Sequence, residues 1–160
     1  MENLIIREAG AKDAELVASF ITKLATHERL KDELAVDAER LRRDLDANAN
    51  PRIWCLIAEI DGVAVGSTIY CLVYNTNTTS WVLHAQDVFV DENHRGHGIG
   101  EALFKRLARI AQERECRLIQ LEVLHWNDDA RAFYEHLGMT PEKEMGKMYL
   151  EGEALRKLSQ

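Results

Sequence analysis

The 160-residue sequence predicts an α/β domain of the α+β type, with helices packed on a central mixed, mainly antiparallel sheet. Two observations support this fold class. Residues 53–60 and 63–74 are apolar runs rich in β-branched side chains, and they flank Asp61-Gly62, a dipeptide typical of a two-residue hairpin, so they should be antiparallel neighbours. A helical segment separates the strand-like residues 81–90 from residues 117–124, which predicts a parallel pair with a right-handed crossover.

Before the hairpin, the sequence predicts one strand and two helices. Leu4–Arg7 is short, apolar and β-branched, as expected of a strand. Asp13 can cap the first helix, which ends near His27, and Asp37 can cap a second, mostly exposed helix that stops before Asn48-Ala49-Asn50-Pro51. Apolar residues recur at helical spacing in both segments: Leu16, Val17, Phe20, Ile21 and Leu24 in the first, Leu41 and Leu45 in the second.

After the hairpin, a polar loop at residues 75–80 leads into the long strand at residues 81–90. A helix is predicted to begin at Glu101, which can pair with Lys105 one turn later on the outer side of the helix. The apolar side of this helix consists of Ile99, Leu103, Leu107, Ile110 and Ala111.

The last part of the chain predicts a helix, a strand and a tail. Asn127 or Asp128 can cap the helix, and Gly138 ends it. Residues 147–150 predict a final strand, and the charged tail after them has helical potential. The inner side of the predicted helix consists of Ala130, Phe133, Tyr134 and Leu137.

Net charge, cysteine spacing and hydropathy limit the partners and the compartment that we expect for this chain. The formal net charge of −7 argues against binding to nucleic acid and, where charge steers a ligand, favours a cationic one. Cys55, Cys71 and Cys116 are odd in number and lack metal-ligand spacing, so we expect reduced core thiols. With no basic leader and no apolar stretch long enough to cross a bilayer, we expect a cytoplasmic protein with no membrane partner.

A glycine-rich loop, His94–Gly100, stands between the strand and the helix. Glycines at alternate positions let the chain turn tightly and point successive N–H groups outward, and the following helix adds its unpaired N-terminal donors. Such a loop suits a phosphate group. Because glycine-rich loops also occur as ordinary turns, the surrounding chain must decide the assignment.

A dinucleotide-binding fold is one interpretation of this loop, since Glu122, near the end of the next strand, could accept a hydrogen bond from a ribose hydroxyl. Residues 91–95, however, separate the strand from the first glycine, and an antiparallel hairpin has no place in a doubly wound parallel sheet. A Walker-type loop is excluded because no Lys-Ser or Lys-Thr follows the glycines.

The loop Arg95-Gly96-His97-Gly98-Ile99-Gly100 resembles the pyrophosphate loop of the GNAT superfamily of acyl-CoA-dependent N-acetyltransferases. That pattern is Arg or Gln, two residues, Gly, one residue, then Gly or Ala, and every fixed position matches. The order of predicted elements is similar along essentially the whole chain, which implies the GNAT fold in one acetyltransferase domain over residues 1–160. Further segments resemble the spermidine/spermine and thialysine acetyltransferase branch: Gln86–Val90, Val123–Asn127, Phe133-Tyr134 and Leu137-Gly138.

The resemblance implies that acetyl-CoA lies where the strand at residues 81–90 separates from the strand at residues 117–124. Strand backbone would hold the pantetheine arm, and loop N–H groups would hold the pyrophosphate. Val88 and Val90 also suit a plain core strand, and Asn127 also suits a plain helix cap. The implied cofactor-binding residues are Val88, Phe89, Val90, Arg95, Gly96, His97, Gly98, Ile99, Gly100, Glu101, Asn127, Asp128, Asp129 and Ala130.

Tyr134 matches the general acid of the family, which protonates the departing CoA thiolate. A phenol suits this task because its ordinary pKa of about 10 keeps it protonated at neutral pH. A core tyrosine is the alternative, since Tyr134 shares a helix side with Ala130 and Leu137. The implied reaction is direct attack of a neutral amine on the thioester, and it needs no metal.

The implied amine side consists of His27, Glu28, Gln86 and Asp87. The polyamine-acetylating branch that this chain resembles has an acid at the position of Gln86 and a tyrosine at the position of His27. The loss of the acid weakens the case for a multiply charged polyamine and removes the most natural base. Asp87, Glu28 or His27 could replace it, although each also suits an ordinary surface or strand-end position.

We therefore expect an N-acetyltransferase that acts on a primary amine of a small molecule: a polyamine, a diamine or a thialysine-like amino acid. A protein amine as acceptor is one alternative. Another is an acyl-CoA-binding regulatory or interaction module in which Gln86 marks lost catalysis. The resemblance also implies a homodimer.

Overall fold

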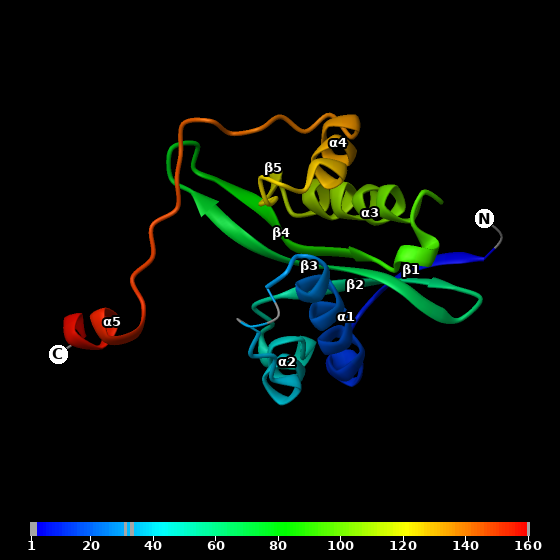
Figure 1. The fold of residues 1–160 in the computed structure, drawn as a ribbon, viewed down its shortest axis with the longest axis horizontal. Helices are drawn as coiled ribbons and strands as arrows, with labels where there is room; N and C mark the ends of the chain where they lie inside the picture. The colour runs from blue at the N-terminus through cyan, green and yellow to red at the C-terminus, as the bar shows by residue number, and fades with distance from the viewer. Residues whose placement is uncertain (1–2, 31, 33, 160) are drawn as a thin grey trace. The chain divides into compact units, whose positions relative to one another are not determined.

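Five strands form one mixed sheet in the order β1-β2-β3-β4-β5, in a computed structural model that describes residues 3–30, 32 and 34–159. Neighbouring strands are antiparallel except for β4 and β5, which are parallel. The predicted mixed, mainly antiparallel sheet is therefore confirmed (Figure 1). The strands are β1 (Leu4–Glu8), β2 (Trp54–Ile60), β3 (Val63–Asn75), β4 (Ser80–Val90) and β5 (Cys116–Leu121).

The chain divides into two units, residues 1–124 and residues 125–160, and the sheet belongs to the first. In this unit, α3 (Ile99–Glu113) covers one face of the sheet, and α1 (Ala14–His27) and α2 (Ala38–Asp44) cover the other (Figure 1). We call these the α3 face and the α1 face. None of the described helices is long and apolar enough to cross a bilayer.

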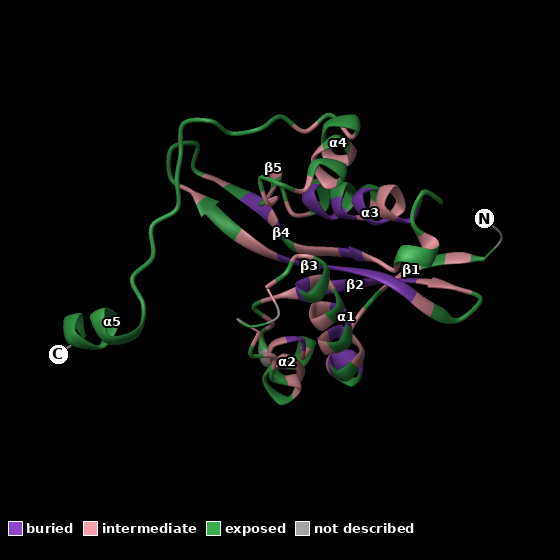
Figure 2. Cartoon of the chain, viewed as in Figure 1, coloured by how far each residue is buried: buried purple, intermediate pink, exposed green. Residues whose placement is uncertain are grey.

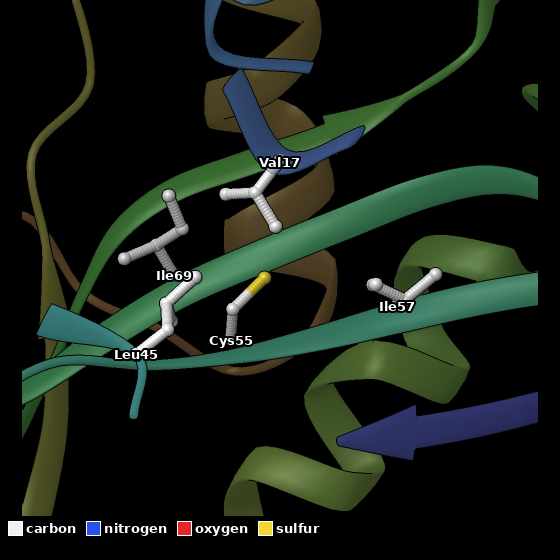
Figure 3. Packing of buried hydrophobic residues seen from close by; sticks show 5 residues of the cluster. All are labelled: Val17, Leu45, Cys55, Ile57 and Ile69. Carbon is white, nitrogen blue, oxygen red and sulfur yellow. The ribbon is translucent and has the colours of Figure 1, made fainter. Parts of the chain in front are cut away.

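The core lies on both faces of the sheet. On the α3 face, Leu103 and Leu107 of α3 are fully buried, and Figure 2 shows the inner side of this helix as buried. On the α1 face, a cluster joins the two helices to β2 and β3 (Figure 3). Its members alternate along the strands, as one face of a sheet requires. They are Val17, Leu45, Cys55, Ile57 and Ile69.

The β2–β3 hairpin has the turn that its sequence predicts. Asp61 and Gly62 have φ of 51° and 80°, both in the left-handed region that a type I′ turn requires. At the start of the chain, the Arg7 guanidinium binds Asp13 at 2.9 Å and Glu59 at 2.7 Å. Asp13 occupies the N-cap position of α1, but its carboxylate accepts from Arg7 and from the Gly10 N–H instead of capping the helix.

The cysteines carry free thiols. Cys55 is buried in the α1-face core, whereas Cys71 and Cys116 are only half-buried. Burial raises the pKa of Cys55 to about 12, so this residue packs as a small apolar group and is not a nucleophile.

The strand β4 changes its pairing at Gln86. On β3, Ile69 faces Asp87 and Tyr70 faces Ala85, so Gln86 has no partner of its own and forms a bulge. On the other side, pairing with β5 ends at Ala85, while β4 continues to Val90. The two parallel strands therefore part at the bulge, and β5 ends earlier than predicted, at Leu121 instead of Leu124.

The second unit, described by itself, contains α4 (Asp128–His136) and α5 (Gly152–Leu158). Asn127, not Asp128, caps α4: its Oδ1 accepts from the Ala130 N–H at 3.2 Å. The helical tail is confirmed as α5, but the predicted strand at residues 147–150 is wrong, because these residues form no strand and the Met148 side chain is 97% exposed. A four-residue apolar run is stable as a strand only when a neighbour satisfies its backbone.

Candidate active site

The glycine loop joins the end of β4 to α3 through a short 3-10 turn at Glu92–His94. Gly96 and Gly98 have φ of 76° and 75°, and a Cβ built on either would meet no atom within 4 Å. Glycine is therefore required here by the left-handed backbone and not by crowding. Gly98 is the N-cap of α3, which begins at Ile99, two residues earlier than predicted.

Two side chains of the loop fold back onto its own backbone. Arg95 Nε donates to the carbonyl of Val90 at 3.0 Å, and His97 Nδ1 lies 2.8 Å from the carbonyl of Arg95. Glu101 pairs with Lys105 at 2.7 Å, as predicted. The bond from Arg95 to Val90 ties the loop to the end of β4, so that Arg95 has a structural role besides the charge it carries.

The end of β4 is also anchored to α1. The Phe89 ring packs on Phe20 with the ring centroids 5.3 Å apart, and Lys23 Nζ lies 3.5 Å from a carboxylate oxygen of Asp91. Val88 and Val90 lie on the same stretch, beyond the last pair of β4 with β5. These contacts hold the strand end in place where its β5-facing edge is open.

The helix α1 ends in a tight reversal that shapes a pocket. Arg29 has a left-handed φ of 62°, its N–H donates to the carbonyl of Thr26, and the Leu30 N–H donates to the carbonyl of Ala25 at 2.8 Å. This is the Schellman arrangement, which returns the chain against the last helical turn. It leaves Glu28 at the C-terminus of the helix and places Leu30 beside it.

Two carboxylates line this pocket, one from α1 and one from β4. The pocket has a volume of about 220 Å³, and Glu28 and Asp87 are the only charged groups in its described lining. The other walls are apolar. The full lining is Ile21, Leu24, Ala25, Glu28, Leu30, Leu34 and Asp87.

Both carboxyl groups resist ionisation. Burial raises the pKa of Asp87, and burial together with the charge of Asp87 raises the pKa of Glu28. Two partly buried acids with no cation in the described lining of the pocket are unfavourable, because buried charge is normally paired. A ligand with an ammonium group would satisfy both, and the negative end of the α1 dipole favours the same charge.

The other two residues of the predicted amine side lie outside the described lining of the pocket. Gln86 is exposed, and its Oε1 lies 3.1 Å from His84 Nε2. His27 is the last residue of α1 and is exposed. The structure thus brings Glu28 and Asp87 together, sets Gln86 beside them on β4, and leaves His27 at the outer side of the helix end.

The second unit holds the remaining predicted residues. Asn127 caps α4, and the first turn of this helix consists of Asp128, Asp129 and Ala130. Tyr134 lies on the half-buried side of the helix. Its ring is beside that of Phe133, with the ring centroids 5.4 Å apart. The capping role alone is enough to explain an asparagine at position 127. Tyr134 shares its helix side with Ala130, as the periodicity predicted.

Sequence reasoning did not predict that Leu30, Leu34 and His84 lie at or near the candidate site. The two leucines follow α1 in a segment without periodicity, and their place depends on the reversal at Arg29. His84 offered one signal, because it lies two positions before Gln86 on a predicted strand, and such residues share a face.

The family model described as "Acetyltransferase (GNAT) family" matches residues 19–139. With a glycine loop opening α3 and a parallel strand pair that parts beside it, the chain belongs to the acetyltransferase (GNAT) family.

Among individual proteins, the chain is similar to a thialysine N-epsilon-acetyltransferase of Sus scrofa, with 33% identity over 99% of each chain. It is also 32% identical to the spermidine/spermine N(1)-acetyltransferase-like protein 1 of Homo sapiens, over 86% of this chain and 21% of that protein. A solved integron cassette protein from V. cholerae shares the fold, with a TM-score of 0.79, 24% identity and coverage of 100% and 99% of the two chains. The similarities to the Sus scrofa and Homo sapiens proteins support the diamine and thialysine branch.

Proposed function

We propose that this protein transfers the acetyl group of acetyl-CoA to a primary amine of a small cationic molecule: a polyamine, a diamine or a thialysine-like amino acid. The observation that carries this proposal is the pocket in which Glu28 and Asp87 face an apolar wall with no cation in its described lining. Carboxylates select an ammonium group, and the apolar wall suits the methylene chain beside it. The name of the Sus scrofa relative supports an amine of this kind.

The glycine loop fits the pyrophosphate of acetyl-CoA. Gly96 and Gly98 leave open space where side chains would stand, and the loop ends at the N-terminus of the fifteen-residue helix α3. The N–H groups of Gly96, His97, Gly98, Ile99, Gly100 and Glu101 would bind the phosphates, with Arg95 adding charge. The backbone of Val88, Phe89 and Val90 would hold the pantetheine arm, because β4 has no β5 partner there.

In the proposed reaction, acetyl-CoA supplies an acetyl group activated as a thioester. The amine loses a proton, its nitrogen attacks the thioester carbonyl, and the carbon–sulfur bond of the tetrahedral intermediate breaks. We assign Tyr134 as the acid that protonates the departing thiolate, and the first turn of α4, Asn127–Ala130, as a border of the CoA. Residues 1–160 would act as one acetyltransferase domain. From the family resemblance, we also propose that the protein forms a homodimer.

The experiment that tests this proposal measures thiol release from acetyl-CoA across a panel of polyamines, diamines, lysine analogues, amino acids and aminoglycosides. We expect amine-dependent release, and Tyr134→Phe should lower kcat about 100-fold or more because it removes the proton donor while the affinity for acetyl-CoA is kept. Tyr149→Phe, which changes an exposed tyrosine, is the matched control. Acetyl-CoA binding without release by any amine would instead favour a binding module.

The loop assignment has its own test. Gly98→Val should abolish acetyl-CoA binding in calorimetry, because a β-branched residue cannot readily adopt the φ of 75° and its side chain would stand where the phosphate binds. Gly146→Val, at a glycine with open space and no left-handed φ, should bind normally. Tight binding by Gly98→Val would refute the loop assignment.

A further inference from the structure

A histidine and two glutamines form a hydrogen-bonded row across β4 and β5. Gln120 Nε2 donates to His84 Nδ1 at 3.2 Å, and His84 Nε2 donates to Gln86 Oε1 at 3.1 Å. His84 and Gln120 are direct partners in the parallel ladder, and Gln86 is the bulged residue two positions further along β4. Both ring nitrogens of His84 are therefore held by side-chain amides.

This row lies where the pairing of β4 with β5 ends, and His84 is three residues before the pocket residue Asp87 on β4. His84 faces Cys71 on β3, and Asp87 faces Ile69 two residues earlier, so His84 and Asp87 share the α1 face. Pairing of β4 with β5 ends one residue after His84, at Ala85. On this face, Gln86 and the His84 ring are the polar side chains of β4 that lie next to Asp87 and to the end of the paired stretch.

We propose that His84 accepts the proton that the substrate amine loses, with Gln86 and Gln120 as positioning residues that hold its ring. The proposal rests on the acetyl transfer proposed above. The Gln120 amide turns away from His84 Nδ1, the ammonium N–H bond breaks, an Nδ1–H bond forms, and the amine nitrogen keeps the electron pair with which it attacks the acetyl carbon. The positive charge moves from the substrate to His84, whose partly exposed ring then releases the proton to water.

Two amides suit this task because each has a donor end and an acceptor end. In the observed arrangement, Nδ1 accepts from Gln120, so the neutral ring carries its proton on Nε2. When Nδ1 gains a proton, rotation of the Gln120 amide presents Oε1 to it, and Gln86 Oε1 still accepts from Nε2. A carboxylate at either position would favour only the charged ring. The row thus lets His84 exist in both protonation states.

Titratable groups on this face come from four elements. They include Cys55 on β2, Cys71 on β3, Asp87 on β4 and Glu28 at the end of α1, while β5 contributes the uncharged Gln120. The two carboxylates bind the ammonium, and His84 takes its proton. The test must therefore separate proton transfer to His84 from proton transfer to the carboxylates.

The test compares His84→Gln with wild type in thiol release at saturating acetyl-CoA and amine, as a function of pH. At neutral pH, kcat should fall about 100-fold, with the KM for acetyl-CoA unchanged. The loss should shrink as pH approaches the pKa of the free amine, about 10.4 for a lysine-like group, because the substrate then arrives neutral. His136→Gln, at an exposed position on α4, is the matched control and should follow wild type.

A second variant separates chemistry from folding. His84→Ala leaves space for a free imidazole, so added imidazole should restore the turnover of this variant at neutral pH. It should not restore the turnover of His84→Gln, because the glutamine side chain fills the space. If His84→Gln keeps the wild-type pH dependence of kcat and Asp87→Asn abolishes that dependence, Asp87 accepts the proton and our proposal is wrong. If wild type transfers acetyl to no amine, the proposed function fails and the role of His84 fails with it.

Discussion

The two faces of the same sheet differ in what they hold. On the α3 face, a fifteen-residue helix packs fully buried leucines against the strands, and Thr68 on β3 is a buried polar residue there. On the α1 face, the apolar cluster around Val17 gives way to Glu28, Asp87 and the His84 row. Both faces contribute to the core, but only the α1 face combines its core with the carboxylates of the candidate site.

The alternation of strand side chains makes this division possible. Asp87 and Val88 are neighbours in sequence but project to opposite faces, and the bulge at Gln86 adjusts which residues face α1. An acid can therefore lie in a pocket without disturbing the core one residue away. Variants on the two faces should accordingly have different effects.

The largest expected effect is on stability, at the α3 face. Leu107→Ala should lower the free energy of unfolding by about 3 kcal/mol, because it removes a fully buried side chain and leaves a cavity. Urea unfolding measures this loss, and the KM for the amine in the folded fraction should not change. Arg109→Ala, on the exposed side of the same helix, should stay within about 0.5 kcal/mol of wild type. An equally large loss there would contradict the division.

The next effect is on amine binding, at the α1 face. Asp87→Asn should raise the KM for the amine about 10-fold, since it removes one of two carboxylates that hold the ammonium. Steady-state kinetics with saturating acetyl-CoA measure it. Glu15→Gln, at an exposed acid in the first turn of α1, should leave this KM unchanged. A similar rise in both variants would show a general charge effect.

The same variant should become more stable at neutral pH. Burial raises the pKa of Asp87, so the folded state binds its proton more tightly than the unfolded state does and ionisation opposes folding. The stability gain of Asp87→Asn over wild type should be full above the raised folded pKa. It should disappear as pH falls to the unfolded value of about 3.9. Urea unfolding across pH measures it, and a gain that grows toward acid would reverse the sign we assign.

The smallest effect is expected at Thr68, whose buried hydroxyl lacks a hydrogen-bond partner among the described residues. Thr68→Val should stabilise the protein by about 1 kcal/mol, because it removes an unsatisfied polar group and keeps the shape. Thermal unfolding measures this change. Thr68→Ser, which keeps the hydroxyl and loses a methyl group, should be destabilised. If valine were the worse residue, the hydroxyl would have a partner in solution.

Local signals predicted most of the fold. The Asp61-Gly62 turn, the Asp37 cap and the glycines before α3 each act within a few residues, and all three are confirmed. The strand at residues 147–150 failed because a strand depends on a partner elsewhere, which four apolar residues do not specify. Local pattern predicts an element, but not what it pairs with.

The candidate site shows the same limit. The loop was visible in the sequence as a run of glycines. That Glu28 and Asp87 line the same pocket depends instead on the reversal at Arg29 and on the register of β4. The resemblance to relatives named both acids without any geometry. The absence of a cation in the described lining, which gives the pocket its chemistry, came only from the structure.

The central claim is that Glu28 and Asp87 together hold the cationic amine. The most direct measurement is calorimetric titration of 1,5-diaminopentane into the CoA-bound protein, in wild type and in the Glu28→Gln/Asp87→Asn double variant. We predict binding to wild type and to Glu15→Gln, and at least about 10-fold weaker binding to the double variant. Equal affinity in all three proteins would place the amine elsewhere and contradict the account.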